Sequence, residues 1–197
     1  TNFILHDAGH PLHAFDADRL AGGRVVVRRS KAGETLSALD HKSYDLPEGL
    51  LVIADAEKPV ALAGVMGAEQ ASVTAGTTRL ILEGAYFAPA EVRRSSRKTR
   101  LRSDSSYRFE RGADPEAARE AAARAEALIL QLAGGRAAGV CESSSPREAN
   151  PVVKTTVSRI NAILGAAFAF EQVRGALAAI AAESKGEADR IEFRAPS

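Results

Sequence analysis

Two histidines and a carboxylate lie within seven residues near the start of the chain, where residues 10–16 read His-Pro-Leu-His-Ala-Phe-Asp. Leu12 and Phe15 are the large apolar side chains that would attach this stretch to a core, which leaves His13 and Asp16 on a short anchored turn. Histidine titrates near neutral pH, so an anchored His13 could transfer a proton or recognise a polar group. It could equally be a structural side chain, and the stretch alone does not separate these interpretations.

Glu83 is a lone carboxylate inside the apolar run Leu-Ile-Leu-Glu-Gly-Ala of residues 80–85. Strand alternation would place Glu83 on the same face as Ile81. A glutamate there is either a solvent-facing charge at a sheet edge or a buried polar group that needs a partner. If it is buried, Glu83 is a candidate for reading a hydroxyl group of a ligand.

Basic side chains crowd residues 93–111, where only Asp104 and Glu110 carry the opposite charge. Like charges four residues apart on a helix cost a few tenths of a kcal/mol per pair, and a polyanion would relieve that repulsion. The segment therefore indicates nucleic-acid binding, with a solvated helix face as the alternative. Its basic residues are Arg93, Arg94, Arg97, Lys98, Arg100, Arg102, Arg108 and Arg111.

Residues 62–67, Leu-Ala-Gly-Val-Met-Gly, place two glycines at the end of a predicted strand, where backbone could approach a ligand closely. This signal is weak, since glycines after strands usually form turns. The chain holds no GxxxxGK[ST], GxGxxG, HExxH, CxxC or GxSxG motif. No metal site is predicted.

The elements that must position these residues change type along the chain. Apolar runs bounded by turn residues predict a sandwich or barrel-like system of sheets, and helical spacing then predicts a helix over 89–98. Asp114 as N-cap and Pro115 in the first turn open a long helix that Gly134-Gly135 ends. The predicted strands cover residues 3–5, 24–29, 35–39, 43–46, 50–54, 60–65 and 79–86.

The predicted fold class is α+β, with antiparallel β-sandwich-like sheets and packed helices over residues 1–142. Residues 143–150, rich in serine, proline and charge, are predicted to be a linker. Residues 151–197 are expected to form a small, truncated, helix-rich module. Its expected elements are a strand over 152–157, helices over 158–164 and 170–182, and a strand at 191–193.

Composition limits the class of protein and the cellular compartment that we expect. The chain has 197 residues, 26% of them charged, with a formal net charge of +1, so any nucleic-acid surface must be local. The single cysteine, Cys141, cannot form an intrachain disulfide, and no apolar run approaches the roughly 20 residues that span a bilayer. We expect a cytoplasmic protein without membrane contact. The start lacks an initiator Met and a basic region, so it does not read as a signal peptide, and we expect a slice of something longer.

With these pieces assembled, the chain resembles the β subunits of bacterial phenylalanyl-tRNA synthetases. Five stretches carry the resemblance, in family order and near family spacing: Thr1–Phe3, His10–Asp16, Leu62–Gly67, Leu82–Phe87 and Arg108–Gly112. The resemblance implies that residues 1–142 are the editing domain, which hydrolyses tyrosine wrongly esterified to tRNA(Phe). The rest looks like the start of the following module.

Carried over to this chain, the resemblance assigns Glu83 to the tyrosine hydroxyl and His13, as the catalytic residue, to the vicinity of the ester. It implies hydrolysis by a positioned water. The other pocket positions are Thr1, Asn2, Ala63, Gly64, Ser103 and Ser105, and the expected tRNA-backbone contacts are Arg94, Arg97, Lys98 and Arg100. Ser105 stands where alanine is common, Tyr107 where histidine is common and His10 where glutamine is common.

The resemblance also implies partners, namely tRNA(Phe) and the α subunit of a heterotetrameric synthetase. No cofactor is expected in these residues, whereas ATP and magnesium bind elsewhere in the full synthetase. Two other functions remain open. One is a scaffold for tRNA docking and subunit assembly without hydrolytic activity, and the other is a free-standing relative that acts in trans.

Overall fold

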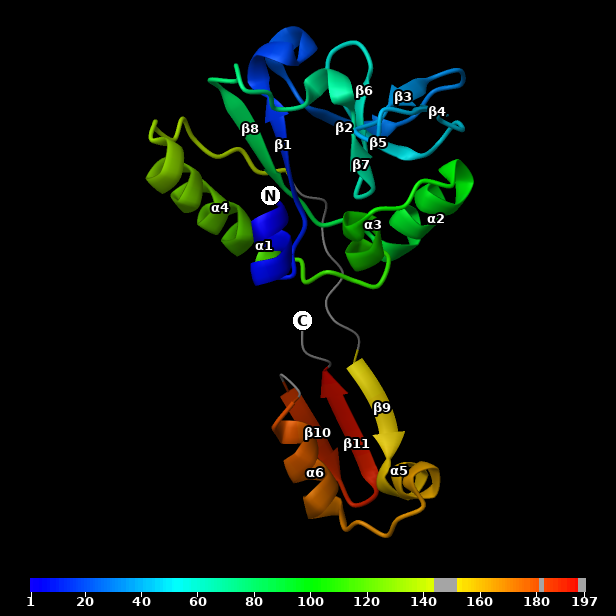
Figure 1. The fold of residues 1–197 in the computed structure, drawn as a ribbon. Helices are drawn as coiled ribbons and strands as arrows, with labels where there is room; N and C mark the ends of the chain where they lie inside the picture. The colour runs from blue at the N-terminus through cyan, green and yellow to red at the C-terminus, as the bar shows by residue number, and fades with distance from the viewer. Residues whose placement is uncertain (144–151, 181–182, 195–197) are drawn as a thin grey trace. The chain divides into compact units, whose positions relative to one another are not determined.

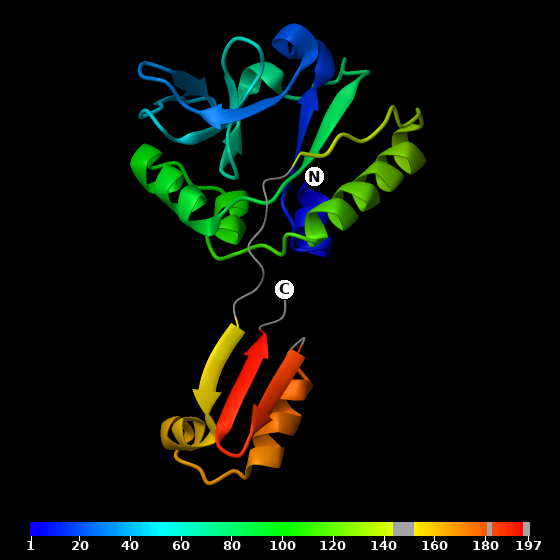
Figure 2. The same ribbon diagram turned by 180° about the vertical axis from the view of Figure 1, so that it is seen from behind.

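The computed structural model describes residues 1–143, 152–180 and 183–194, and the chain divides into two compact units, Thr1–Ala138 and Gly139–Ser197 (Figures 1 and 2). Both units mix helices with antiparallel sheets, which confirms the predicted α+β class. Nearly all of the predicted linker, residues 144–150, lies outside the described residues. Within the described parts of the chain, no helix is both long and apolar enough to cross a membrane.

The first unit holds three antiparallel sheets. The strands of the largest, in the order β2-β5-β6-β7, are β2 (Val26–Arg29), β5 (Leu51–Ala54), β6 (Pro59–Leu62) and β7 (Met66–Gly67). Strand β1 (Leu12–Asp16) pairs with β8 (Leu80–Gly84), and β3 (Thr35–Ser37) forms the predicted hairpin with β4 (Ser43–Asp45). Side chains from all three sheets share one apolar core, in which Phe15, Leu50 and Val60 are fully buried.

Helices α1 (Asn2–Asp7) and α4 (Ala117–Ala133) pack on the β1–β8 sheet (Figure 1). Helix α2 (Pro89–Thr99) contacts strand β5 of the larger sheet and also helix α3 (Asp104–Phe109). Single 3-10 turns cover Ala17–Arg19, Ala21–Gly23 and Glu69–Ala71. The alanine-rich α4 lies so close to β8 that a Cβ on Gly84 would be 2.8 Å from the Ala118 carbonyl oxygen, so only glycine fits there.

The main differences from the predicted elements of the first unit concern residues 3–5, residues 12–16 and the start of α4. Residues 3–5 belong to helix α1 rather than a strand, because six residues are too short to show helical periodicity. Residues 12–16 form strand β1 rather than a turn, because their hydrogen-bonding partner β8 lies almost seventy residues further on. Helix α4 begins at Ala117, since the Asp114 carboxylate accepts a bond from the Glu116 N–H in the turn before it.

In its described residues, the second unit is a three-stranded antiparallel sheet with two helices. Its elements are β9 (Val152–Thr156), α5 (Val157–Leu164), α6 (Phe170–Ala178), β10 (Glu183–Glu187) and β11 (Arg190–Arg194), with strand order β10-β11-β9. Its buried core is Val157, Val173 and Ile191. Strand β10 was not predicted, because Glu-Ser-Lys-Gly-Glu carries no β-forming residue. The helix predicted over 170–182 ends at Ala178, and residues 181–182 lie outside the described part of the chain.

Candidate functional site

A cavity of about 50 Å³ lies where β1, β8, the β6–β7 turn and α3 meet. Two ionisable side chains reach it from neighbouring strands, His13 from β1 and Glu83 from β8, and the antiparallel register places these two residues directly opposite each other. The remaining lining is mostly apolar or glycine: Pro11, Leu12, Ile53, Ala61, Leu62, Gly64, Val65, Met66, Gly67, Phe87, Ser105 and Phe109.

Glu83 brings a carboxyl group into this apolar setting without a compensating partner. Its Oε2 atom is buried and accepts no hydrogen bond from the described residues. Burial raises the pKa of Glu83 to about 7, because the ionised form loses its hydration and gains no cation in exchange. The carboxyl therefore exists in both protonation states near neutral pH, ready to accept or to donate a hydrogen bond.

His13 shows the opposite shift for the same reason. Its Nε2 atom is buried without a partner in the described parts of the chain, and its ring stands edge-on to Phe15 at a centroid distance of 4.5 Å. Burial lowers the pKa of His13 to about 4. The imidazole is therefore neutral at physiological pH and keeps a free nitrogen for proton transfer or polar recognition.

Two glycines of the β6–β7 region make room for this arrangement. A Cβ on Gly67 would overlap the His13 ring, so the imidazole packs directly on backbone. Gly64 has a positive φ of 69°, and a Cβ there would lie 2.9 Å from both Phe87 and Val92. Small residues at these two positions are thus a steric requirement of the cavity.

An aromatic wall completes the cavity. Phe87, which follows β8, and Phe109, at the end of α3, meet edge to face with their centroids 5.2 Å apart. Such pairs are stable and present flat apolar surface to a ligand. The cavity thus combines aromatic surface, an unpaired carboxyl and a neutral imidazole.

The predicted pocket residues divide between lining and support. His13, Glu83, Gly64 and Ser105 line the cavity together. Ala63 does not line it, and its N–H donates to the Leu51 carbonyl at 3.2 Å.

Ser103 also stands outside the lining, because its hydroxyl caps α3. The hydroxyl accepts from the Ser106 N–H at 3.1 Å and donates to the Val65 carbonyl. Thr1 and Asn2 are exposed where α1 begins and do not line the cavity. Phe87 and Phe109 line the cavity but were not among the predicted pocket residues. Their only signal was their presence in two of the family stretches, since aromatic residues next to apolar runs normally read as core.

A second hollow, of about 360 Å³, lies on helix α2 and is lined by Ala90, Arg93, Arg94, Arg97 and Lys98. We call these four basic side chains and Arg100 the α2 basic surface.

Two members of the α2 basic surface already have partners. Arg94 pairs with Glu91 at 2.6 Å, and Arg93 donates to the Glu110 carbonyl at 2.6 Å. Arg97, Lys98 and Arg100 make no ion pair within the described residues, so their charges are available to an anion.

Among the described residues, no group of three or more His, Cys, Asp or Glu side chains is gathered in a way that could hold a metal ion.

The chain is similar to one family model over part of its length and to several known proteins over all or most of its length. The B3/4 domain family model matches residues 1–134. The chain is 44% identical over its full length to a phenylalanine–tRNA ligase beta subunit from Anaeromyxobacter dehalogenans, of which it spans 25%, and 42% identical to that from Chlorobaculum tepidum, with the same coverage. A Geobacter metallireducens beta subunit is 48% identical over 84% of the chain and 21% of its own length. The chain therefore spans about a quarter of these relatives.

Proposed function

The chain belongs to the B3/4 domain family, and from this premise we propose that its cavity hydrolyses tyrosine wrongly esterified to tRNA(Phe). The likeness to phenylalanine–tRNA ligase beta subunits supports this assignment, since a ligase for phenylalanine must deal with tyrosine. One observation carries the proposal: two buried polar atoms without partners in the described structure, Oε2 of Glu83 and Nε2 of His13, face one cavity from opposed strands.

The physical need is a difference of one hydroxyl group. An apolar ligation pocket rejects a side chain with an added hydroxyl by only about a hundredfold. A second site that hydrogen-bonds the hydroxyl can reject the analogue lacking it by roughly ten-thousandfold, because the polar group of the site is then left unpaired. Glu83 beside the Phe87–Phe109 wall has the chemistry for this second site: ring contact for tyrosine and a carboxyl for its hydroxyl.

The proposed reaction is direct hydrolysis without a covalent enzyme intermediate. A water oxygen attacks the ester carbonyl carbon, the bond to the ribose oxygen breaks, and the products are free tyrosine and a tRNA with a free 3′-terminal hydroxyl. His13 orients this water or accepts its proton, which its neutral imidazole allows at physiological pH, or it contacts the terminal ribose. An aminoacyl ester is already activated, so positioning supplies much of the effect.

The α2 basic surface is the proposed contact for the tRNA backbone. Arg97, Lys98 and Arg100, whose charges have no partner in the described residues, would bind phosphates, and Arg94 would do so in competition with Glu91. Replacing Arg97 or Lys98 by Gln should weaken tRNA binding and reduce the slope of log Kd against log salt by about one for each phosphate that is no longer neutralised. An unchanged slope would argue against this surface as the binding site for the backbone.

The wider assembly is proposed by analogy with the relatives. We infer that the chain works in a cytoplasmic phenylalanine–tRNA ligase beside an α subunit, and that ATP and magnesium bind to other parts of that ligase.

The test is single-turnover deacylation of tyrosyl-tRNA(Phe) and phenylalanyl-tRNA(Phe) by the complete ligase. We compare the wild type with Glu83→Ala and His13→Ala, and with Glu57→Ala as a control for loss of an exposed carboxylate. Glu83→Ala should abolish the preference for the tyrosyl ester, and His13→Ala should slow its hydrolysis by about a hundredfold or more. If neither variant changes deacylation while tRNA still binds, the region is a docking scaffold rather than a hydrolase.

A further inference from the structure

His10 is a buried histidine that the proposed hydrolysis does not use. It precedes β1, is 1% exposed and contacts two segments far along the chain. Its Nε2 lies 3.1 Å from the carbonyl oxygen of Ala85, and its ring stands edge-on to Phe109 with the centroids 5.8 Å apart. One side chain thus joins three segments of the first unit.

The contact with a carbonyl fixes the protonation of the ring. Because a carbonyl oxygen only accepts, Nε2 of His10 must carry the proton, and Nδ1 is left buried without a partner in the described residues. Burial lowers the pKa of His10, although the bond to Ala85 and the negative charge of Asp114 act in the opposite direction. His10 is therefore neutral at pH 7 and works as a hydrogen-bond donor.

The three joined segments are those that build the cavity. Ala85 lies midway between Glu83 and Phe87, both in the cavity lining, and Phe109 lines the cavity itself. The residues that follow His10 lead directly into β1 and His13. A shift of the Ala85 carbonyl would move Glu83 and Phe87 relative to each other.

We propose that His10 is a positioning residue for the cavity: its N–H bond to the Ala85 carbonyl and its edge contact with Phe109 hold the aromatic wall beside the Glu83 carboxyl. An apolar side chain could fill the same space and would leave no buried nitrogen unpaired, but it could not hold the carbonyl. The consequence for selectivity rests on the proposed function, whereas the positioning itself does not.

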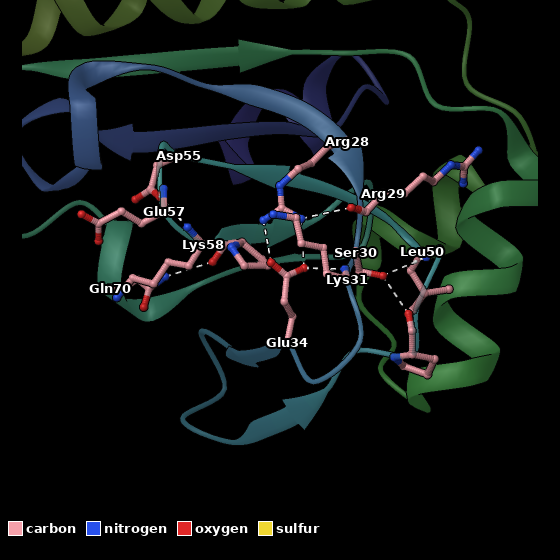
Figure 3. Close-up of polar contacts among 12 residues, drawn as sticks. Arg28, Arg29, Ser30, Lys31, Glu34, Leu50, Asp55, Glu57, Lys58 and Gln70 are labelled. Atoms are coloured by element: carbon pink, nitrogen blue, oxygen red, sulfur yellow. Dashed lines mark hydrogen bonds and ion pairs between the residues drawn. The ribbon is translucent and has the colours of Figure 1, made fainter.

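The first test reads the environment of Glu83 without any substrate. In the 197-residue chain, ¹³C NMR follows the titration of the Glu83 carboxyl in the wild type, His10→Leu and His10→Gln. The control, Ser30→Ala, removes a similarly buried side chain that bonds backbone of other segments, the Pro47 carbonyl at 2.7 Å and the Leu50 N–H at 2.9 Å, away from the cavity (Figure 3).

His10→Leu should let water reach the carboxyl and lower the Glu83 pKa by about one unit or more toward its ordinary value. His10→Gln, whose amide can donate to the same carbonyl, should keep the wild-type pKa, as should Ser30→Ala. A folded His10→Leu variant with an unchanged Glu83 pKa overturns the inference.

The second test reads selectivity in the complete ligase. His10→Leu should reduce the ratio of tyrosyl to phenylalanyl ester hydrolysis by about tenfold, and His10→Gln should restore it. Equal loss of both rates, with the ratio unchanged, would count against positioning. A wild type that hydrolyses neither ester refutes the proposed function, and the Glu83 titration then still decides the role of His10.

A third measurement needs no variant and applies even if His10→Leu does not fold. The ¹⁵N shifts of the His10 imidazole in the wild type should show the neutral form with the proton on Nε2 at pH 7. A proton on Nδ1 alone, or a charged ring, overturns the inference.

Discussion

Two groups of buried or half-buried polar side chains in the first unit differ in how they are satisfied. Beside β2 and β5, Arg28 and Glu34 form two bonds of 2.9 and 2.7 Å, and the Asp55 carboxylate accepts three backbone N–H bonds (Figure 3). In the cavity, Glu83 and His13 each keep a buried atom without a partner in the described structure.

The pKa shifts record the same difference. The hydrogen bond from Arg28 lowers the pKa of Glu34. Burial alone would raise the pKa of Asp55, but three backbone N–H donors hold it below its ordinary value. In the cavity, burial is the cause of the raised pKa of Glu83 and the main cause of the lowered pKa of His13. Both shifts favour the neutral form of the side chain. Satisfied groups stabilise the fold, whereas unsatisfied groups cost stability and are free to bind a ligand.

The largest change in stability should follow from removing the Asp55 carboxylate, whose hydrogen bonds are all formed. Asp55→Ala leaves three backbone N–H donors without their acceptor, so urea unfolding of the 197-residue chain should show a loss of roughly 3 to 5 kcal/mol. Asp55→Asn, which keeps one acceptor oxygen, should lose clearly less. Equal losses in the two variants would show that the charge, rather than the bonds, stabilises this turn.

Removing the Glu83 carboxylate from the cavity should instead raise the stability of the chain at high pH. The pKa of Glu83 is raised in the folded state, so folding is most favoured below the unfolded value near 4.5, and this advantage is lost as the pH rises to about 7. Glu83→Gln avoids that loss and should stabilise the chain at pH 8 by up to about 3 kcal/mol, with no gain at pH 4. Lower stability at pH 8 would mean that the carboxylate has a stabilising partner.

Gly67→Ala tests whether the packing of the His13 ring on the Gly67 backbone matters for hydrolysis. The new methyl group would overlap the His13 ring, and displacement of the ring should slow tyrosyl ester hydrolysis by about a hundredfold. Gly76→Ala is the matched control, since a Cβ there would meet only the Thr74 hydroxyl, at 3.9 Å. Equal rates for the two variants would exclude the packing on Gly67 as a constraint on His13.

The smallest expected effect is a change in how the free energy of unfolding depends on pH. His13 stays neutral in the folded state down to about pH 4, so its burial costs stability increasingly as the pH falls from 6.5 to 4, opposite to the trend from Glu83. The two trends nearly cancel between pH 4.5 and 6.5 in the wild type. Glu83→Gln should uncover a rise in stability of about 1.4 kcal/mol per pH unit over that range. A flat profile in the variant would contradict the low pKa of His13.

The sequence by itself determined the local parts of this protein. Helix α2, with Pro89 in its first turn, the β3–β4 hairpin and the α+β class were predicted from short-range patterns and confirmed. The family followed from five short stretches and was confirmed by the match to the B3/4 domain. These features depend on neighbouring residues or on recurring sequence, both of which can be read from the chain directly.

Only the tertiary structure decided what the candidate site contains. The sequence left open whether Glu83 is buried, placed His13 on a turn, and assigned His10 no role. Pairing of β1 with β8 across almost seventy residues set His13 opposite Glu83, and burial beside one cavity left each of them with an atom that has no partner among the described residues. Strand pairing and burial depend on distant residues, so local patterns do not contain them, and the opposite pKa shifts of the two groups follow from the fold alone.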